Sequence, residues 1–294
     1  MQRNSLKGSL FVFLSALLFG SYGIWAVLLS SDFGVFFQGY VRSLLVLIVL
    51  VPIIIIKKSW IPLTKHDWIK YAWCCGFGIF TQAPLYYAFQ NAGVGISSLM
   101  FFSALLITSY AVGFVLIKEA STRTKLISLV LAIIGLSFTF FKSLEFFSLA
   151  ALLLAALNGV ASGGEVATTK LVPEKFSALQ TSVMVWGAIF ISHLIASFVA
   201  GEQQIVPALN IHWLAMLGFT VAGIMAFWLV IEGFKYVDAT VGGLIGLLEV
   251  VAAIIFGAIV FHEQITPPII IGSILIIGAA ALPHIKWRIV MQQN

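Results

Sequence analysis

Three charged residues lie inside long apolar stretches of this chain. They are Arg42 in FQGYVRSLL, Glu165 in GGEVATTKL and Glu249 in LLEVVAA. In a membrane helix, a charge near the bilayer centre costs on the order of 3 kcal/mol unless it is solvated or paired. We therefore expect all three side chains to face the interior of a helix bundle, where they could bind a solute or a proton.

Each of these residues also has a purely structural interpretation. Glu249 could hold a proton or a cation, or make a hydrogen bond between helices. The planar guanidinium of Arg42 could anchor a substrate carboxylate, or pair with a carboxylate or with carbonyl groups at a helix end. Glu165 could bind a proton or cation, or form an ion pair with nearby Lys170.

Aromatic and amide side chains accompany these charges near the middle of similar stretches. Aromatic rings attract amines through cation–π interactions, and amides supply hydrogen bonds. The candidates are Tyr22, Trp25, Tyr86, Trp186 and Trp228, together with Gln82 and Asn158. His262-Glu263 lacks the second histidine of a HExxH motif, so we expect no metal and no cofactor.

The composition indicates what surrounds these residues. Of 294 residues, 61% are hydrophobic and 9% are charged, whereas soluble domains carry roughly 25% charged residues. The apolar runs are long and do not alternate, which predicts an all-α membrane protein in contact with the lipid bilayer. Excess Lys and Arg is typical of cytoplasmic loops and does not require a nucleic-acid partner.

Charged or Gly/Pro/Asn-rich breaks divide the chain into ten predicted transmembrane segments, each long enough to cross about 30 Å of hydrocarbon. With alternate loops on alternate sides, fourteen Lys and Arg residues lie on one side and only Lys142 on the other. This bias predicts that both termini are cytoplasmic. The segments are 8–30, 33–56, 68–90, 94–117, 124–141, 147–169, 176–200, 212–233, 237–261 and 267–288.

The sequence also repeats itself. GIFTQAPLYYAFQNAGVGISSLM from Gly78 aligns with GIMAFWLVIEGFKYVDATVGGLI from Gly223, and Glu119 aligns with Glu263. The offset is 143 to 145 residues, which predicts two five-helix repeats, 1–141 and 145–290. An odd number of helices per repeat inverts the second one, and inverted repeats let a central site open to either face, as in many transporters.

The two copies of a helix that ends in glutamate, followed by a polar turn and a glycine-spaced helix closing in Ile-Ile-Gly, resemble the EamA family of the drug/metabolite transporter superfamily. Arg42 resembles an arginine that this family often has in its second helix, whereas Val250 stands where proline is common. GGEVATTKL faintly resembles the glutamate region of small multidrug resistance proteins. The resemblance implies that helices one, three, six and eight surround the cavity, which favours Tyr22, Trp25, Tyr86 and Trp228.

The sequence therefore predicts a secondary transporter, not an enzyme. We expect alternating access that moves a small metabolite or drug across the inner membrane, with export favoured by the resemblance and proton coupling as one hypothesis. No oligomer is required, because two repeats in one chain form a complete unit. The alternatives are a membrane-embedded receptor or enzyme, an importer, and a channel.

Overall fold

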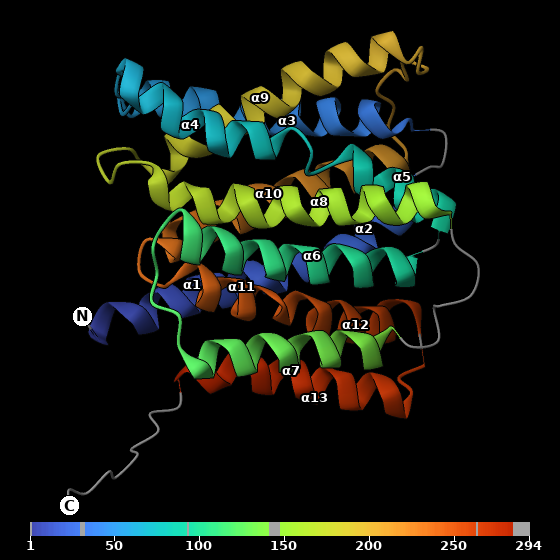
Figure 1. Cartoon of the computed structure of the whole chain (residues 1–294). Helices are drawn as coiled ribbons and strands as arrows, with labels where there is room; N and C mark the ends of the chain where they lie inside the picture. Colours follow the sequence, from blue (N-terminus) through green and yellow to red (C-terminus); the bar gives the residue numbers. More distant parts are fainter. Residues whose placement is uncertain (1, 30–32, 93, 141–147, 263, 285–294) are drawn as a thin grey trace, which may run out of the picture.

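The computed structural model describes residues 2–29, 33–92, 94–140, 148–262 and 264–284. All regular structure in these residues is helical, and Figure 1 shows the helices packed side by side with connecting loops at two ends. The helices are α1 (Gln2–Gly20), α2 (Tyr22–Leu28), α3 (Val35–Ile56), α4 (Lys65–Gly78), α5 (Ala83–Ala92), α6 (Val94–Val115), α7 (Arg123–Thr139), α8 (Leu149–Thr168), η2 (Thr169–Leu171), α9 (Ala178–Val199), α10 (Ile211–Phe234), α11 (Ala239–Gly246), α12 (Leu248–Phe261), α13 (Pro267–Ala281) and η3 (Leu282–His284).

Eight helical stretches in the described residues are long and apolar enough to cross a membrane. They correspond to eight of the ten predicted segments, with α1–α2 and α11–α12 each forming one stretch. The predicted segment 68–90 is divided between α4 and α5, of 14 and 10 residues, and the predicted segment 124–141 contains α7, of 17 residues. Neither segment contains a single helix long enough to count as a membrane span: a break divides the first, and the helix in the second is too short.

The break between α4 and α5 follows from Pro84. Proline has no N–H, so the carbonyl four residues earlier, that of Phe80, loses its helical hydrogen bond. The Asn158 side chain on α8 donates to this carbonyl from 3.0 Å. Asn158 is fully buried, and its amide replaces the missing backbone donor.

Two further helices are interrupted inside the bundle. The first predicted segment is interrupted at Ser21, between α1 and α2, and the ninth at Leu247, between α11 and α12, although Val250 replaces the family's proline. Each of the three interruptions lies beside a candidate site residue: Tyr22, Gln82 or Glu249. Irregular backbone inside a membrane protein is typical of places where it is buried in protein or lines a binding site.

Helices α3 and α9 pack against each other in opposite directions. At one end, Ile61, which follows α3, exchanges two hydrogen bonds with the Gln180 side chain at the start of α9, at 3.0 and 2.7 Å. At the other end, Glu202, which follows α9, accepts hydrogen bonds from the backbone N–H groups of Phe36 and Phe37 at the start of α3, at 3.1 and 2.6 Å. Each helix therefore ends where the other begins.

Helices α7 and α13 form a second antiparallel pair. A Cβ built at Gly272, near the start of α13, would lie 2.6 Å from the carbonyl oxygen of Gly135, whereas one built at Gly278 would lie 3.7 Å from Leu131. Residue numbers thus fall along α7 as they rise along α13.

Helix α8 packs closely on α6 at Gly159 and Gly163, where a Cβ would lie 2.2 and 2.4 Å from α6 carbonyl oxygens. These two glycines therefore act in packing, as their GxxxG spacing indicates.

Four residues in the described part of the chain have a left-handed backbone, and they form two pairs. Lys58 (φ 49) follows α3 and Gly201 (φ 66) follows α9, at an offset of 201 − 58 = 143. Lys118 (φ 60) follows α6 and His262 (φ 56) follows α12, at an offset of 262 − 118 = 144. The corresponding helices of the two sequence repeats therefore end in the same kind of turn.

One end of the bundle carries nearly all the basic loop residues. We call it the basic end: it contains the start of α1 and the loops 57–64, 116–122, 169–177 and 235–238 (Figure 1). The described residues of the loops at the opposite end, near 29–34, 200–210 and 262–266, contain no Lys or Arg. Lys142, Lys286 and Arg288, which entered the predicted orientation, lie outside the described residues.

Candidate functional site

Arg42 lies at the centre of a polar cluster inside the bundle. Its side chain projects from α3 and is only 2% exposed. Nη1 donates to Gln82 Oε1 at 3.0 Å, and Nη2 donates to the Tyr22 hydroxyl. The same Gln82 oxygen accepts a hydrogen bond from the Tyr86 hydroxyl at 2.9 Å. One guanidinium thus links α2 and α3 to the segment between α4 and α5, and Gln82 passes the contact on to Tyr86 of α5.

Aromatic rings from the second half of the chain enclose the same guanidinium. Its Cζ lies 3.7 Å from the ring centre of Phe219 on α10 and 5.2 Å from that of Trp186 on α9. It also lies 4.6 Å from the Tyr22 ring. These distances are typical of cation–π interactions. Gly223 on α10 makes room for the group, since a Cβ there would lie 2.4 Å from Nη2.

We call these six residues the Arg42 cluster: Tyr22, Arg42, Gln82, Tyr86, Trp186 and Phe219. Within the described residues, Arg42 has no carboxylate partner, and its Nε lacks a hydrogen bond. Among these residues the positive charge is held by neutral groups only, so the arrangement can bind an anionic group. Tyr22, Gln82 and Tyr86 are half-buried, whereas Arg42 itself is buried.

Glu249 lies beside this cluster, in the first turn of α12. Its carbonyl oxygen packs against α1, 2.9 Å from where a Cβ on Gly20 would lie, and Gly20 is two residues before Tyr22. The side chain is half-buried, and its carboxylate makes no hydrogen bond or ion pair to any described residue. Within the described residues, the Glu249 carboxylate therefore makes no helix-to-helix hydrogen bond.

Glu165 is a second interior carboxylate and is only 5% exposed on α8. Its Oε1 lies 3.1 Å from the Cβ position of Gly78, at the end of α4, where Val185 of α9 also packs. The alternative pairing with Lys170 is wrong, because Lys170 Nζ lies 3.0 Å from Glu119 Oε1 instead. Two carboxylates and one arginine thus lie in the bundle interior.

Two hollows lie elsewhere in the described structure. One, of about 130 Å³, is at the basic end and is lined by Lys170, Phe176 and Phe234 among others. The other, of about 350 Å³, is apolar and includes Leu10, Leu248 and Ile277. Neither contains a residue of the Arg42 cluster, so we assign the candidate site from its charge, hydrogen bonds and burial.

The family comparison matches almost the whole chain. The sequence model of the EamA-like transporter family matches residues 6–141 and again residues 149–283. The chain belongs to the EamA-like transporter family. This confirms the predicted resemblance and places the chain in the drug/metabolite transporter superfamily. It is therefore a multi-pass membrane protein of a transporter family.

Solved structures share the fold of this EamA-like transporter. One, titled "Crystal structure of protein", has a TM-score of 0.76 and 15% sequence identity, and the match covers 94% of this chain and 96% of the other. At that identity the likeness concerns the fold alone. No curated protein matches the chain.

Of the predicted site residues, the structure brings Tyr22, Arg42, Gln82 and Tyr86 into direct contact. Three others lie elsewhere. The Trp25 indole packs on Gly218 and donates to Ser21 Oγ at 3.2 Å, and the Asn158 amide is engaged by the α4–α5 break. Trp228 is 45% exposed and faces Phe11, with ring centres 6.4 Å apart.

Two members of the Arg42 cluster were not selected from the sequence. No sequence feature discussed above points to Phe219, and the family resemblance favours helices one, three, six and eight, whereas Trp186 is in the seventh. The spacing of Phe219 and Gly223, four residues apart on α10, was the available signal. This spacing places both residues on one face of α10, and only the structure shows that this face meets Arg42.

Proposed function

We propose that this EamA-like transporter is a secondary transporter that exports a small metabolite or drug, such as an amino acid or amine, across the inner membrane by alternating access. The observation that carries the proposal is the Arg42 cluster. Helices α2, α3 and α5 from the first half and α9 and α10 from the second half all contribute to it. A site assembled from both halves can change its exposure when the halves move relative to each other.

The proposed architecture is ten membrane spans in two inverted five-helix repeats, 1–141 and 145–290. In inverted repeats, corresponding helices run in opposite directions. The second helices of the two halves, α3 and α9, and the fifth, α7 and α13, are antiparallel pairs. The paired left-handed turns at offsets 143 and 144 support the same correspondence.

The basic end is proposed to face the cytoplasm, with both termini there, because basic loops are retained on that side. Single cysteines near Lys65, Arg123 and Lys175 should react with a membrane-impermeant maleimide only from the cytoplasm. A cysteine near Gln203 should react only from outside. Reaction of both groups from one face would contradict the inverted arrangement.

Within the site, the residues have complementary roles. Arg42 attracts the anionic part of a solute, while the half-buried Glu249 holds either a proton or the solute's cationic part. Glu165, also unpaired among the described residues, is the second candidate for proton coupling. A solute that carries both an amine and an acidic group would use both charges.

The test is solute flux in proteoliposomes, screened against amino acids, quaternary amines, purines and cationic dyes. A transporter gives counterflow, in which solute on the far side accelerates entry, whereas a channel gives flux without it. A receptor or enzyme gives no protein-dependent flux. Reversing the gradients then separates export from import.

Variants of Glu249 distinguish its roles. If Glu249 couples protons, Glu249→Gln abolishes accumulation driven by a pH gradient while exchange without a gradient persists. If it binds the cationic group, the same change weakens solute binding by about 1.5–3 kcal/mol. Glu232→Gln, at the basic end of α10, is the control and should behave as the parent. Parental coupling and affinity in a stable Glu249→Gln protein would eliminate both roles.

A further inference from the structure

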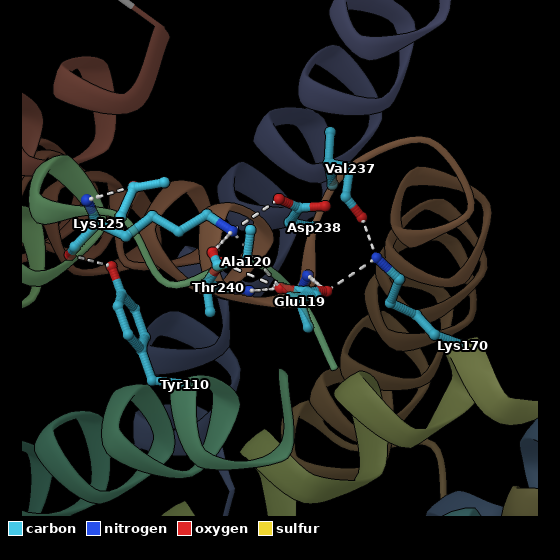
Figure 2. A network of polar contacts seen from close by, with 10 residues as sticks. Tyr110, Glu119, Ala120, Lys125, Lys170, Val237, Asp238 and Thr240 are labelled. Carbon is cyan, nitrogen blue, oxygen red and sulfur yellow. Dashed lines mark hydrogen bonds and ion pairs between the residues drawn. The ribbon is translucent and has the colours of Figure 1, made fainter. Parts of the chain in front are cut away.

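An ionic network centred on a buried glutamate joins the two halves at the basic end. Its centre is Glu119, which directly follows the left-handed turn after α6 and whose side chain is 5% exposed. The carboxylate accepts hydrogen bonds from the backbone N–H groups of Ala239 and Thr240, at 2.6 and 3.3 Å, and from the Thr240 hydroxyl at 3.2 Å. Lys170 donates to the same carboxylate at 3.0 Å. Figure 2 shows these side chains converging.

A second ion pair lies against the first. Lys125 Nζ on α7 lies 2.7 Å from Asp238 Oδ2 and 3.9 Å from Glu119 Oε2, and it donates to the carbonyl of Ala120 at 3.0 Å. The Tyr110 hydroxyl donates to the Lys125 carbonyl at 2.7 Å, which fixes the start of α7 (Figure 2). We call Glu119, Lys125, Lys170, Asp238 and Thr240 the Glu119 network.

Two of the three ion pairs of the Glu119 network, Lys170–Glu119 and Lys125–Asp238, cross from one half of the chain to the other, whereas Lys125–Glu119 lies within the first half. Glu119 and Lys125 belong to the first half, whereas Lys170, Asp238 and Thr240 belong to the second. Two acidic and two basic side chains balance, so the network is neutral while the halves touch. Separating them would leave the buried Glu119 carboxylate and the buried Lys125 ammonium without their cross-half partners until water entered, which is costly in a low-dielectric environment, whereas the Asp238 side chain is 51% exposed.

The aligned positions of the other repeat do not carry the same set of charges. At the offset of 143 to 145 residues, the glutamate is retained but no basic or second acidic residue is. Glu119 aligns with Glu263, Lys125 with Ile269, Asp238 with Gly93, and Lys170 with positions 25–27, Trp-Ala-Val.

We propose that the Glu119 network is an ionic lock that closes the basic end, and that the lack of the same set of charges at the aligned positions of the other repeat makes the closed basic end the resting state without substrate. This inference rests on the proposed alternating access. The two conformations of an inverted repeat are nearly equivalent by architecture, so an ionic network whose charges are not repeated at the aligned positions shifts their populations.

The lock predicts how accessible the α6–α11 interface is from the basic end. Ser109 on α6 is 2% exposed, and its Oγ lies 3.2 Å from the Cβ position of Gly243 on α11. A cysteine at Ser109, with Cys74 and Cys75 replaced by alanine, reports whether the interface opens. The measurement is its rate of modification by a water-soluble maleimide in membrane vesicles that expose the basic end.

We expect slow modification in the parent and at least a tenfold faster rate in both Glu119→Gln and Lys170→Met. A tenfold change corresponds to about 1.4 kcal/mol in the opening equilibrium. The control is Glu232→Gln, which removes an ion pair at the same end that lies within α10 and its cap, Glu232–Lys235 at 2.9 Å. This control should leave the rate unchanged.

Unchanged rates in both folded lock variants would overturn the proposal, as would an equal acceleration by the control. If neither lock variant folds, the network stabilises the fold and not one state, and the proposal also fails. Counterflow measured on the same vesicles separates the two hypotheses. Parental counterflow with unchanged accessibility refutes the lock alone, whereas absence of counterflow in the parent refutes the proposed transport function.

Discussion

The close packing of the Arg42 guanidinium against Gly223 of α10 can be tested by adding a side-chain carbon at Gly223. In Gly223→Ala, the new Cβ would lie 2.4 Å from Arg42 Nη2 and 2.9 Å from the Tyr22 hydroxyl. Ordinary contacts between heavy atoms begin at about 3.5 Å, so the guanidinium must retreat by roughly 1 Å. Its hydrogen bonds to Tyr22 and Gln82 cannot both survive that movement.

The expected cost follows from the two effects. Overpacking a tight site costs about 1–3 kcal/mol, and a hydrogen bond within a membrane bundle contributes about 0.6 kcal/mol. We expect Gly223→Ala to lower the free energy of unfolding by about 2–3 kcal/mol, measured by equilibrium unfolding in mixed micelles. We also expect weaker solute binding in counterflow, because Arg42 no longer occupies its position.

The control is Gly187→Ala on α9, next to Trp186, where a new Cβ meets no atom within 4 Å. It should be neutral or more stable by about 0.5–1 kcal/mol, since alanine favours helix more than glycine does. Adding Tyr22→Phe to Gly223→Ala removes the hydroxyl and gives Nη2 space, so the combined loss should be smaller than the sum. Equal stability of Gly223→Ala and the parent would refute this seating of Arg42.

Three other changes test the frame around the site. Asn158→Leu leaves the Phe80 carbonyl unpaired and should lower the free energy of unfolding by about 1–3 kcal/mol, and adding Pro84→Ala, which restores a backbone donor, should recover part of the loss in the same assay. A hydrogen bond from the Thr64 backbone and, next in size, one from Lys175 lower the pKa of Asp67 to about 2. The stability that the ionised carboxylate contributes is present above the ordinary pKa of aspartate and is lost as pH falls toward 2. Asp67→Asn should therefore flatten the pH dependence of the melting temperature between about pH 5 and about pH 2. Glu202→Ala removes the carboxylate that caps α3 and should cost about 0.5–2 kcal/mol in the unfolding titration, unless water replaces it without loss.

The sequence alone determined the class of protein, most of the helices and the family. These features are local or periodic. Apolar runs set where helices can lie in lipid, and the offset of 143 to 145 residues between the two repeats can be read directly from the amino-acid sequence. The family assignment was confirmed by a model that matches both halves. Arg42, Gln82, Tyr22 and Tyr86 could be chosen because polar groups in such runs need interior partners.

Only the tertiary structure decided which partners those groups have. Helix α10 is apolar on all sides, so its pattern could not tell that Phe219 and Gly223 face Arg42 while Trp228 faces outward. Lys170 is five residues from Glu165 in sequence, yet it pairs with Glu119, 51 residues away. The rotation of a helix about its axis and the meeting of distant segments depend on how all the helices pack together, and no local stretch of sequence contains that information.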